Sequence, residues 1–236
     1  MYSHTFNKTI LREYDIRGIV GKDLNLIDAL YLGKSFATLL KRNKYKNVVI
    51  GYESLSVATG SFQSVIIGDG ACGDGVVNAG QMVAIGSKAL QNLASGSYNV
   101  AVGYNAGNDA TLASGSVFLG YDAGGTVTTG NQNIAIGLDS MNGAATTGDN
   151  NIAIGVSAGD ALTSGYSNIL MGKEAGGALT TGNRNIAIGH NALDAADGAE
   201  ADNIAIGYAA LGNLDHDSAS KNIAIGSYAG DGMGAF

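Results

Sequence analysis

The sequence predicts a mainly β fold, a parallel β-solenoid or β-roll of about ten stacked coils, and two observations carry this prediction. A pentapeptide close to Asn-Ile-Ala-Ile-Gly recurs eleven times at steps of 17 to 19 residues. Apolar and small side chains alternate within most copies, which is the period of a strand. A unit this short cannot bury a core alone, so it must stack on its neighbours. The copies begin at Asn47, Ser64, Met82, Asn99, Ser116, Asn133, Asn151, Asn168, Asn185, Asn203 and Asn222.

The two faces of each strand differ in side-chain size. Ile134 and Ile136 share one face, and Ala135 takes the other. We expect the isoleucine pairs to fill the interior of each coil. Small side chains permit close approach of another backbone, so we expect the alanine face to contact neighbouring protomers. A slender coil buries little apolar surface, which favours an oligomer. The alanines of this proposed contact are Ala135, Ala153, Ala187 and Ala205.

Two repeated positions are predicted to be structural. The asparagine that opens most copies is a turn former, and its amide can bond the coil above and below in a ladder. The glycine that ends each strand marks a backbone position where a side chain would obstruct, such as a tight corner. At about 4.8 Å per coil the stack would be a rod of roughly 50 Å. The predicted structural positions include Asn99, Asn133, Asn151, Asn168, Asn185, Asn203, Asn222, Gly103, Gly137, Gly155, Gly189, Gly207 and Gly226.

Composition divides the chain into two predicted domains, residues 1–52 and residues 53–236, with the first repeat strand beginning at residue 47. Residues 1–52 hold nine Lys and Arg against four Asp and Glu, whereas residues 53–236 hold four against sixteen. Of the 37 glycines, 33 lie after residue 52. The acidic balance of the repeats argues against a nucleic-acid partner.

Chemistry-bearing motifs are scarce. Cys72 is the only cysteine, so no intrachain disulfide can form, and its glycine-rich surroundings hold no nearby histidine. The glycine-rich tracts match no phosphate-binding loop, and the calcium nonapeptide pattern is not repeated. We therefore expect no cofactor, no metal and no catalytic residue. The N-terminus has no signal-peptide core, and no run approaches a membrane span, so we expect a chain made in the cytosol and not inserted in a membrane.

The phased NIAIG copies with their trailing alanines resemble the NxxAIGxxA head repeats of trimeric autotransporter adhesins and related repeats of bacteriophage tail-fibre proteins. The likeness covers about residues 47–236. It implies a homotrimeric β-roll that displays a surface for a host-cell receptor or glycan, together with other tail or surface proteins as partners. Adhesins of that family carry a secretory signal and a membrane anchor, and neither is visible here. This favours a tail-fibre segment on the virion, assembled in the host cytosol. The alternative is the head fragment of a bacterial trimeric adhesin at the cell surface.

Residues 1–52 follow a different pattern. A short strand at 13–17, a helix whose apolar stripe falls within 29–40, and a buried-type strand at 47–51 predict a β-α-β segment. The stretch FNKTILREYDIRGIVGKDL and the later NVVIGY resemble the N-terminus of the phosphohexomutases (phosphomannomutase/phosphoglucomutase). That resemblance implies that Tyr14 and Arg17 would lie near a sugar-phosphate site.

The phosphohexomutase likeness ends at Tyr52. The phosphoserine loop and the metal-binding aspartates of that family are absent, and without a phosphoryl carrier or metal no phosphoryl transfer is expected. We therefore predict a protein that is not an enzyme, with a truncated phosphohexomutase as a further alternative.

Two side-chain arrays suggest rival binding roles. Tyrosines beside the glycine corners are candidates for glycan binding or for plain coil packing. Repeated Thr-Thr-Gly edges are typical of ice-binding solenoids, although Ala-Asp-Gly and Asp-Ser-Ala interrupt the series. The tyrosines are Tyr98, Tyr104, Tyr121, Tyr166, Tyr208 and Tyr228, and the threonine pairs are Thr128-Thr129, Thr146-Thr147 and Thr180-Thr181.

Overall fold

The computed structural model describes residues 11–12, 15–16, 47–56, 63–74, 78–214 and 219–232. The chain forms two compact units, Met1–Lys46 and Asn47–Phe236. In the first, β1 (Leu11–Arg12) and β2 (Asp15–Ile16) pair antiparallel. The helix expected within 29–40 lies outside the described residues.

The strand that was expected to close a β-α-β segment, β3 (Val48–Ile50), pairs in parallel with the next repeat strand. It is the first strand of the solenoid, so the predicted β-α-β arrangement is not supported. The physical reason lies in the sequence, because this strand already carries the apolar pattern and spacing of the repeats that follow.

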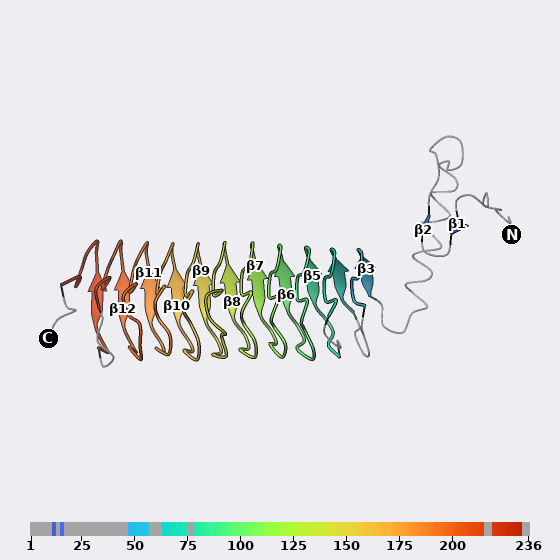
Figure 1. Ribbon diagram of the computed structural model, residues 1–236. Helices are drawn as coiled ribbons and strands as arrows, with labels where there is room; N and C mark the ends of the chain where they lie inside the picture. The colour runs from blue at the N-terminus through green and yellow to red at the C-terminus, as the bar shows by residue number, and fades with distance from the viewer. Residues whose placement is uncertain are drawn as a thin grey trace, which may run out of the picture. The chain divides into compact units, whose positions relative to one another are not determined.

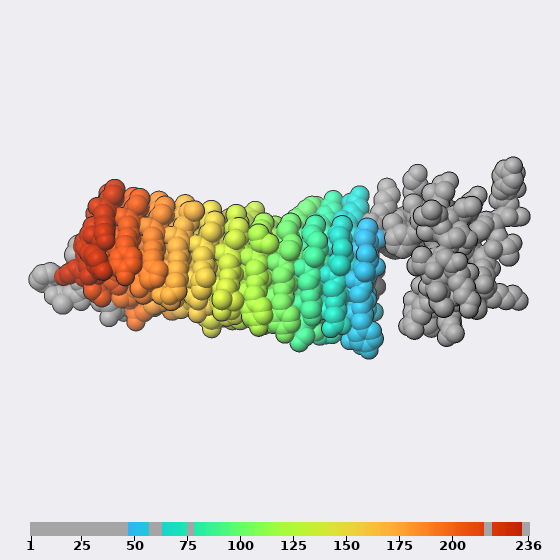
Figure 2. All heavy atoms as spheres, turned by 90° about the horizontal axis from the view of Figure 1, so that it is seen from above, coloured from blue at the N-terminus to red at the C-terminus, as the bar shows by residue number. Residues whose placement is uncertain are grey.

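The second unit is a parallel β-solenoid, as predicted (Figure 1). Its described residues contain eleven strands in one sheet, stacked in chain order. Neighbouring strands pair in register, so that Ala135 lies opposite Ala153. Figure 2 shows successive coils side by side in chain order. After β3 the strands are β4 (Val65–Ile67), β5 (Val83–Ile85), β6 (Val100–Val102), β7 (Val117–Leu119), β8 (Ile134–Ile136), β9 (Ile152–Ile154), β10 (Ile169–Met171), β11 (Ile186–Ile188), β12 (Ile204–Ile206) and β13 (Ile223–Ile225).

In the described residues each coil has one strand, three residues long. The other described residues of the coils lie mainly in turns and bends, where backbone hydrogen bonds join neighbouring coils. Val127 and Thr146 also form an isolated parallel bridge there. The glycine after each strand makes the corner. Gly137 has φ +126°, and a Cβ on it would lie 2.6 Å from the Gly155 carbonyl oxygen of the next coil. A side chain is therefore excluded by both conformation and space.

The interior of the rod is lined by the alanines, which overturns the predicted orientation of the strands. Ala135, Ala153, Ala187 and Ala205 are fully buried within their own chain. The flanking positions of each strand point outward and are partly or well exposed, as in the buried–exposed alternation of β8. The isoleucines therefore form an outer face, and the alanines face the core rather than a neighbouring protomer.

The narrow cross-section of the coil explains this orientation. A Cβ on Gly159, in the turn that faces the strand, would lie only 3.6 Å from the Ala153 Cβ, so the gap accommodates little more than a methyl group. Two larger inward residues, Phe118 and Leu170, are matched by glycines in the facing turns. The Phe118 ring occupies the space that a side chain on Gly107 or Gly124 would need, and Leu170 does the same beside Gly159. In several coils with an inward alanine, the turn residue six positions later, which is equivalent to Gly124, is large and buried. These residues are Leu90, Met141, Leu193 and Leu211.

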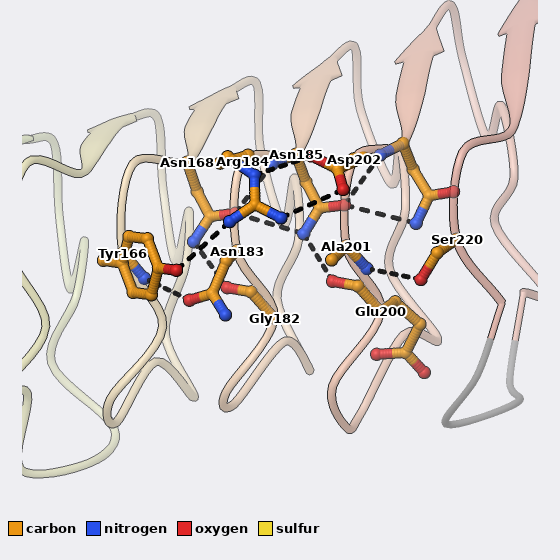
Figure 3. A network of polar contacts seen from close by, with 11 residues as sticks. Tyr166, Asn168, Gly182, Asn183, Arg184, Asn185, Glu200, Ala201, Asp202 and Ser220 are labelled. Atoms are coloured by element: carbon orange, nitrogen blue, oxygen red, sulfur yellow. Dashed lines mark hydrogen bonds and ion pairs between the residues drawn. The ribbon is translucent and has the colours of Figure 1, made fainter.

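Buried asparagines join the coils inside the rod. The Asn151 Oδ1 accepts a hydrogen bond from the Asn168 backbone N–H at 3.0 Å, and its Nδ2 donates to the Gly165 carbonyl at 2.8 Å. Figure 3 shows the same linkage continuing from Asn168 to the next coil. The ladder satisfies backbone groups that would otherwise be buried without a partner. Its members are Asn99, Asn133, Asn151, Asn168, Asn185, Asn203 and Asn222.

Replacing one rung with serine tests the ladder. In Asn151→Ser the hydroxyl can still accept from Asn168, as the Ser116 hydroxyl accepts from the next coil at 3.1 Å. The donor to the Gly165 carbonyl is lost, so we expect a loss of about 1–3 kcal/mol in the free energy of unfolding, measured in urea. The matched change Ser116→Asn should be neutral or stabilising. An unchanged stability of Asn151→Ser would contradict a stabilising ladder.

Candidate interaction surfaces

One face of the rod is formed entirely by apolar side chains. The two outward positions of the eleven strands form two columns that contain only Val, Ile, Leu and Met. Their exposure is substantial even within the stack: Leu119 is 44% exposed and Ile188 37%. We call this surface the Ile/Val face. Its first column is Val48, Val65, Val83, Val100, Val117, Ile134, Ile152, Ile169, Ile186, Ile204 and Ile223, and its second is Ile50, Ile67, Ile85, Val102, Leu119, Ile136, Ile154, Met171, Ile188, Ile206 and Ile225.

The Ile/Val face is large for a surface left in water. Eleven strands at about 4.8 Å and two columns about 7 Å apart give roughly 50 by 12 Å, or about 600 Å². This size lies at the upper end of the largest apolar patch on a typical monomeric protein, and such patches are often functional. The face is therefore a candidate contact surface.

A second apolar feature lies just past the glycine corners of four consecutive coils. Tyr104, Tyr121, Leu138 and Val156 occupy equivalent positions there, and all four are well exposed. The rings of Tyr104 and Tyr121 are stacked, with centroids 5.1 Å apart and an interplanar angle of 19°. We call these four residues the corner stripe. It adjoins the second column of the Ile/Val face, because one glycine separates each of its members from a strand end.

The coils that carry the corner stripe are acidic. No Lys or Arg occurs between Lys88 and Lys173, whereas this stretch contains five aspartates. The charges of Asp122 and then, more weakly, Asp139 raise the pKa of the Tyr121 hydroxyl. Burial raises the pKa of the aspartate Asp160, and its backbone hydrogen bonds partly oppose this rise. These coils therefore carry negative charge with no basic side chain of their own to balance it.

Acidification should stabilise the rod through its half-buried aspartates. A carboxyl whose folded pKa is raised binds its proton more tightly in the folded state than in the unfolded state. For Asp160 and Asp194, whose pKa values are both raised chiefly by burial, stability is gained as the pH falls through the folded pKa. The gain is complete below the unfolded value of about 3.8. The exposed Asp202 acts in the opposite direction, because Arg184 lowers its pKa.

The variant Asp160→Asn keeps an oxygen to accept its backbone hydrogen bonds but cannot be charged. We expect it to raise the melting temperature at pH 7, by a shift equivalent to no more than about 1 kcal/mol, and to flatten the dependence of melting temperature on pH between 7 and 4. Asp202→Asn is the control and should lower stability slightly at pH 7. An Asp160→Asn variant that is less stable than the wild type at pH 7 would show that burial of this charge does not destabilise the folded state.

An exposed polar network lies two or three residues before the first column of the Ile/Val face (Figure 3). The Arg184 guanidinium donates to both carboxylate oxygens of Asp202, at 2.7 and 3.0 Å, and to the Tyr166 hydroxyl at 3.1 Å. This pairing raises the pKa of Arg184. The network links three successive coils, but exposed ion pairs contribute little to stability. It acts as a surface feature rather than as a determinant of the fold.

Four of the six hydroxyl groups in the predicted threonine pairs donate to carbonyls of the next coil. Thr128 donates to the Thr146 carbonyl at 3.3 Å and Thr147 to the Thr163 carbonyl at 3.4 Å. Thr146 donates to the Leu162 carbonyl at 2.8 Å and Thr180 to the Asp197 carbonyl at 2.6 Å. These four hydroxyl groups therefore join coil to coil, and their protons are not free for an ice-binding surface.

The remaining chemistry-bearing side chains are dispersed. Cys72 is fully buried, which raises the pKa of its thiol to about 12, so it is a poor nucleophile. Asp74 accepts a hydrogen bond from Gln91, and His190 stacks on Tyr208 with ring centroids 5.3 Å apart. Among the described residues no group of three or more His, Cys, Asp or Glu is placed to hold a metal ion.

The comparisons with known proteins give no name to these surfaces. No family model, no curated protein and no solved structure matches this chain. Within the described residues no helix has the length and apolar character needed to cross a membrane.

The Ile/Val face is the surface that the sequence analysis missed, because it assigned these side chains to the interior. A signal for the correct orientation was present in the sequence. Phe118 and Leu170 replace the usual alanine at the centre of the strand, and both are followed six residues later by a glycine, Gly124 and Gly176. A bulky residue matched by a glycine indicates two positions that share one enclosed space.

Proposed function

We propose that this chain is a structural and adhesive fibre segment, of the kind used in phage tail fibres, that presents a binding surface to a receptor or glycan on a host cell. The observation that supports this best is the single stack of coils, in which one buried side chain per strand suffices for the core and the other side chains of the strand face outward. A fold of this kind offers a long repetitive surface at low cost in buried residues. The resemblance of residues 47–236 to tail-fibre and adhesin repeats agrees with this role.

The fibre acts as a homotrimer. Three copies held side by side would present three equivalent surfaces, and their joint binding raises the effective concentration of each site. Weak single contacts with a receptor then give firm attachment. The chain performs no catalysis in this role, since presentation of a surface requires none.

Cell binding tests the proposal. The purified chain, labelled with a fluorophore on surface lysines, is added to a panel of bacterial strains and measured by flow cytometry, with an unrelated protein of similar acidity as control. We expect saturable binding to some strains, displaced by unlabelled chain. Binding no stronger than that of the control on every strain, across a broad panel, would contradict an attachment role. Turnover of a hexose phosphate by the same preparation would favour the mutase alternative instead.

A further inference from the structure

We propose that the Ile/Val face is the contact between copies of this chain, with the rods side by side, parallel and in register. This inference rests on the trimeric part of the proposed function and assigns the surface responsible for it. It also reverses the expectation that the alanines make this contact, because Ala135 and its equivalents are fully buried within one chain.

The size of the face fits a protein interface. Its area of about 600 Å² approaches the roughly 800 Å² per partner of a standard stable interface. The face runs along all eleven described strands of the sheet without a charged residue. Burying these partly exposed Val and Ile side chains along this length supplies hydrophobic energy that the thin core of a single coil lacks.

A second copy is the occupant that matches the face best. A surface that covers it must be apolar over about 50 Å and must repeat every 4.8 Å or so. The Ile/Val face of another copy meets both conditions, and identical chains associate around a rotation axis. Around a three-fold axis parallel to the rods, the first column of one copy would meet the second column of the next. Parallel and in-register rods would bring each outward column against a column with the same repeat.

The corner stripe favours more than two copies. Tyr104, Tyr121, Leu138 and Val156 extend the apolar surface past the strand ends and beyond the flat face. A single flat partner covers only the face, whereas a cyclic arrangement places a neighbour on each side of it. The aspartates beside the stripe repel those of another copy, so added salt should strengthen the association.

Charged substitutions on the face provide the test. In Ile136→Lys/Ile154→Lys both side chains point outward and can extend into water in an isolated rod, so the fold should survive. Ile136→Thr/Ile154→Thr keeps the β-branched shape and weakens the face more gently. The matched control, Leu112→Lys/Ala145→Lys, places the same charges on exposed turn residues away from the face. Mass is measured by sedimentation velocity, and folding by circular dichroism.

We expect the wild type and the control to sediment as three chains, 3 × 23.8 = 71.4 kDa. The lysine variant should be a folded monomer at the same concentration, and the threonine variant should associate at least tenfold more weakly. A trimer that persists in the folded lysine variant would overturn the assignment of the face while leaving the trimer intact. A monomeric wild type would overturn both, and the cell-binding assay would still decide the attachment role separately. If the lysine variant misfolds, the sedimentation of the threonine variant tests the assignment: unweakened association would overturn it.

Discussion

Replacing Phe118 with alanine is expected to destabilise the rod by about 3–5 kcal/mol, among the largest effects of any single side chain. Phe118 is the largest fully buried residue described, and it takes the inward place that alanine occupies in most coils. Its ring fills space in two coils, since Gly107 and Gly124 leave room for it. The truncated variant would keep both glycines and so would leave a cavity with nothing to close it.

A second substitution in the same space should repair much of this loss. In Phe118→Ala/Gly124→Leu the coil acquires the pairing found in the coils of β5 and β11, an inward alanine faced by Leu90 or Leu193. Those leucines adopt the positive φ that Gly124 also has, so the backbone tolerates the change. Gly124→Leu alone should be strongly destabilising, because its side chain would overlap the Phe118 ring. The double variant is thus expected to recover at least about 2 kcal/mol relative to Phe118→Ala, a coupling typical of residues in contact.

Urea unfolding of the four proteins in this cycle gives the coupling energy directly. Additive effects of the two substitutions would mean that Phe118 and Gly124 do not share a space. That outcome would contradict the orientation of the strands, in which the central residue of each pentapeptide faces the core.

Replacing Gly137 with alanine is expected to cost about 3 kcal/mol or more, and the same change at Gly226 far less. Both glycines have φ +126°, so the conformational cost of a side chain, about 1–3 kcal/mol, is common to the two. Of the two, Gly137 alone has a following coil against it within the described residues: a Cβ there would lie 2.6 Å from the Gly155 carbonyl oxygen. At Gly226 the added Cβ would meet the Ala229 Cβ at 3.9 Å and no carbonyl of the described residues. The difference between the variants therefore isolates the close approach of neighbouring coils.

Thermal and urea unfolding of both variants measure this difference. We expect Gly137→Ala to be less stable than Gly226→Ala by about 2 kcal/mol or more, since a clash with backbone cannot be relieved by a side-chain rotation. Equal losses at the two sites would contradict the model of coils packed backbone to backbone at the corners.

The stacking of the coils was predictable because the pentapeptide recurs eleven times at a near-constant spacing. The constant interval, the terminal glycine and the opening asparagine each require the same register, and the strands pair in that register from β3 to β13. The ladder was predictable for the same reason, since Asn151 and its equivalents recur at one position. Repetition amplifies a weak local signal into a strong one.

The orientation of the strands was not predicted, because alternation alone does not say which face is inside. Hydrophobicity favoured an interior of isoleucine, as in an ordinary β-sheet with one buried face. The enclosed space is instead too narrow for isoleucine in most coils, and its width depends on the residues of the turn that faces the strand. Only the coils of Phe118 and Leu170 indicate this in the sequence, because glycines in the facing turns accompany those two large residues.

Distances between spin labels along the rod test the central claim most directly. Gln81, Asn150 and Lys221 each precede the opening residue of a repeat and are exposed, four and eight strands apart along the sheet from β5 to β9 and β13. Cysteine pairs at 81/150 and 81/221 are labelled in a Cys72→Ala background and diluted with unlabelled chain. In-register stacking predicts separations of about 19 and 38 Å, in proportion to the number of coils. Separations that do not grow with coil number would contradict the stacked rod, and with it the fibre that we propose.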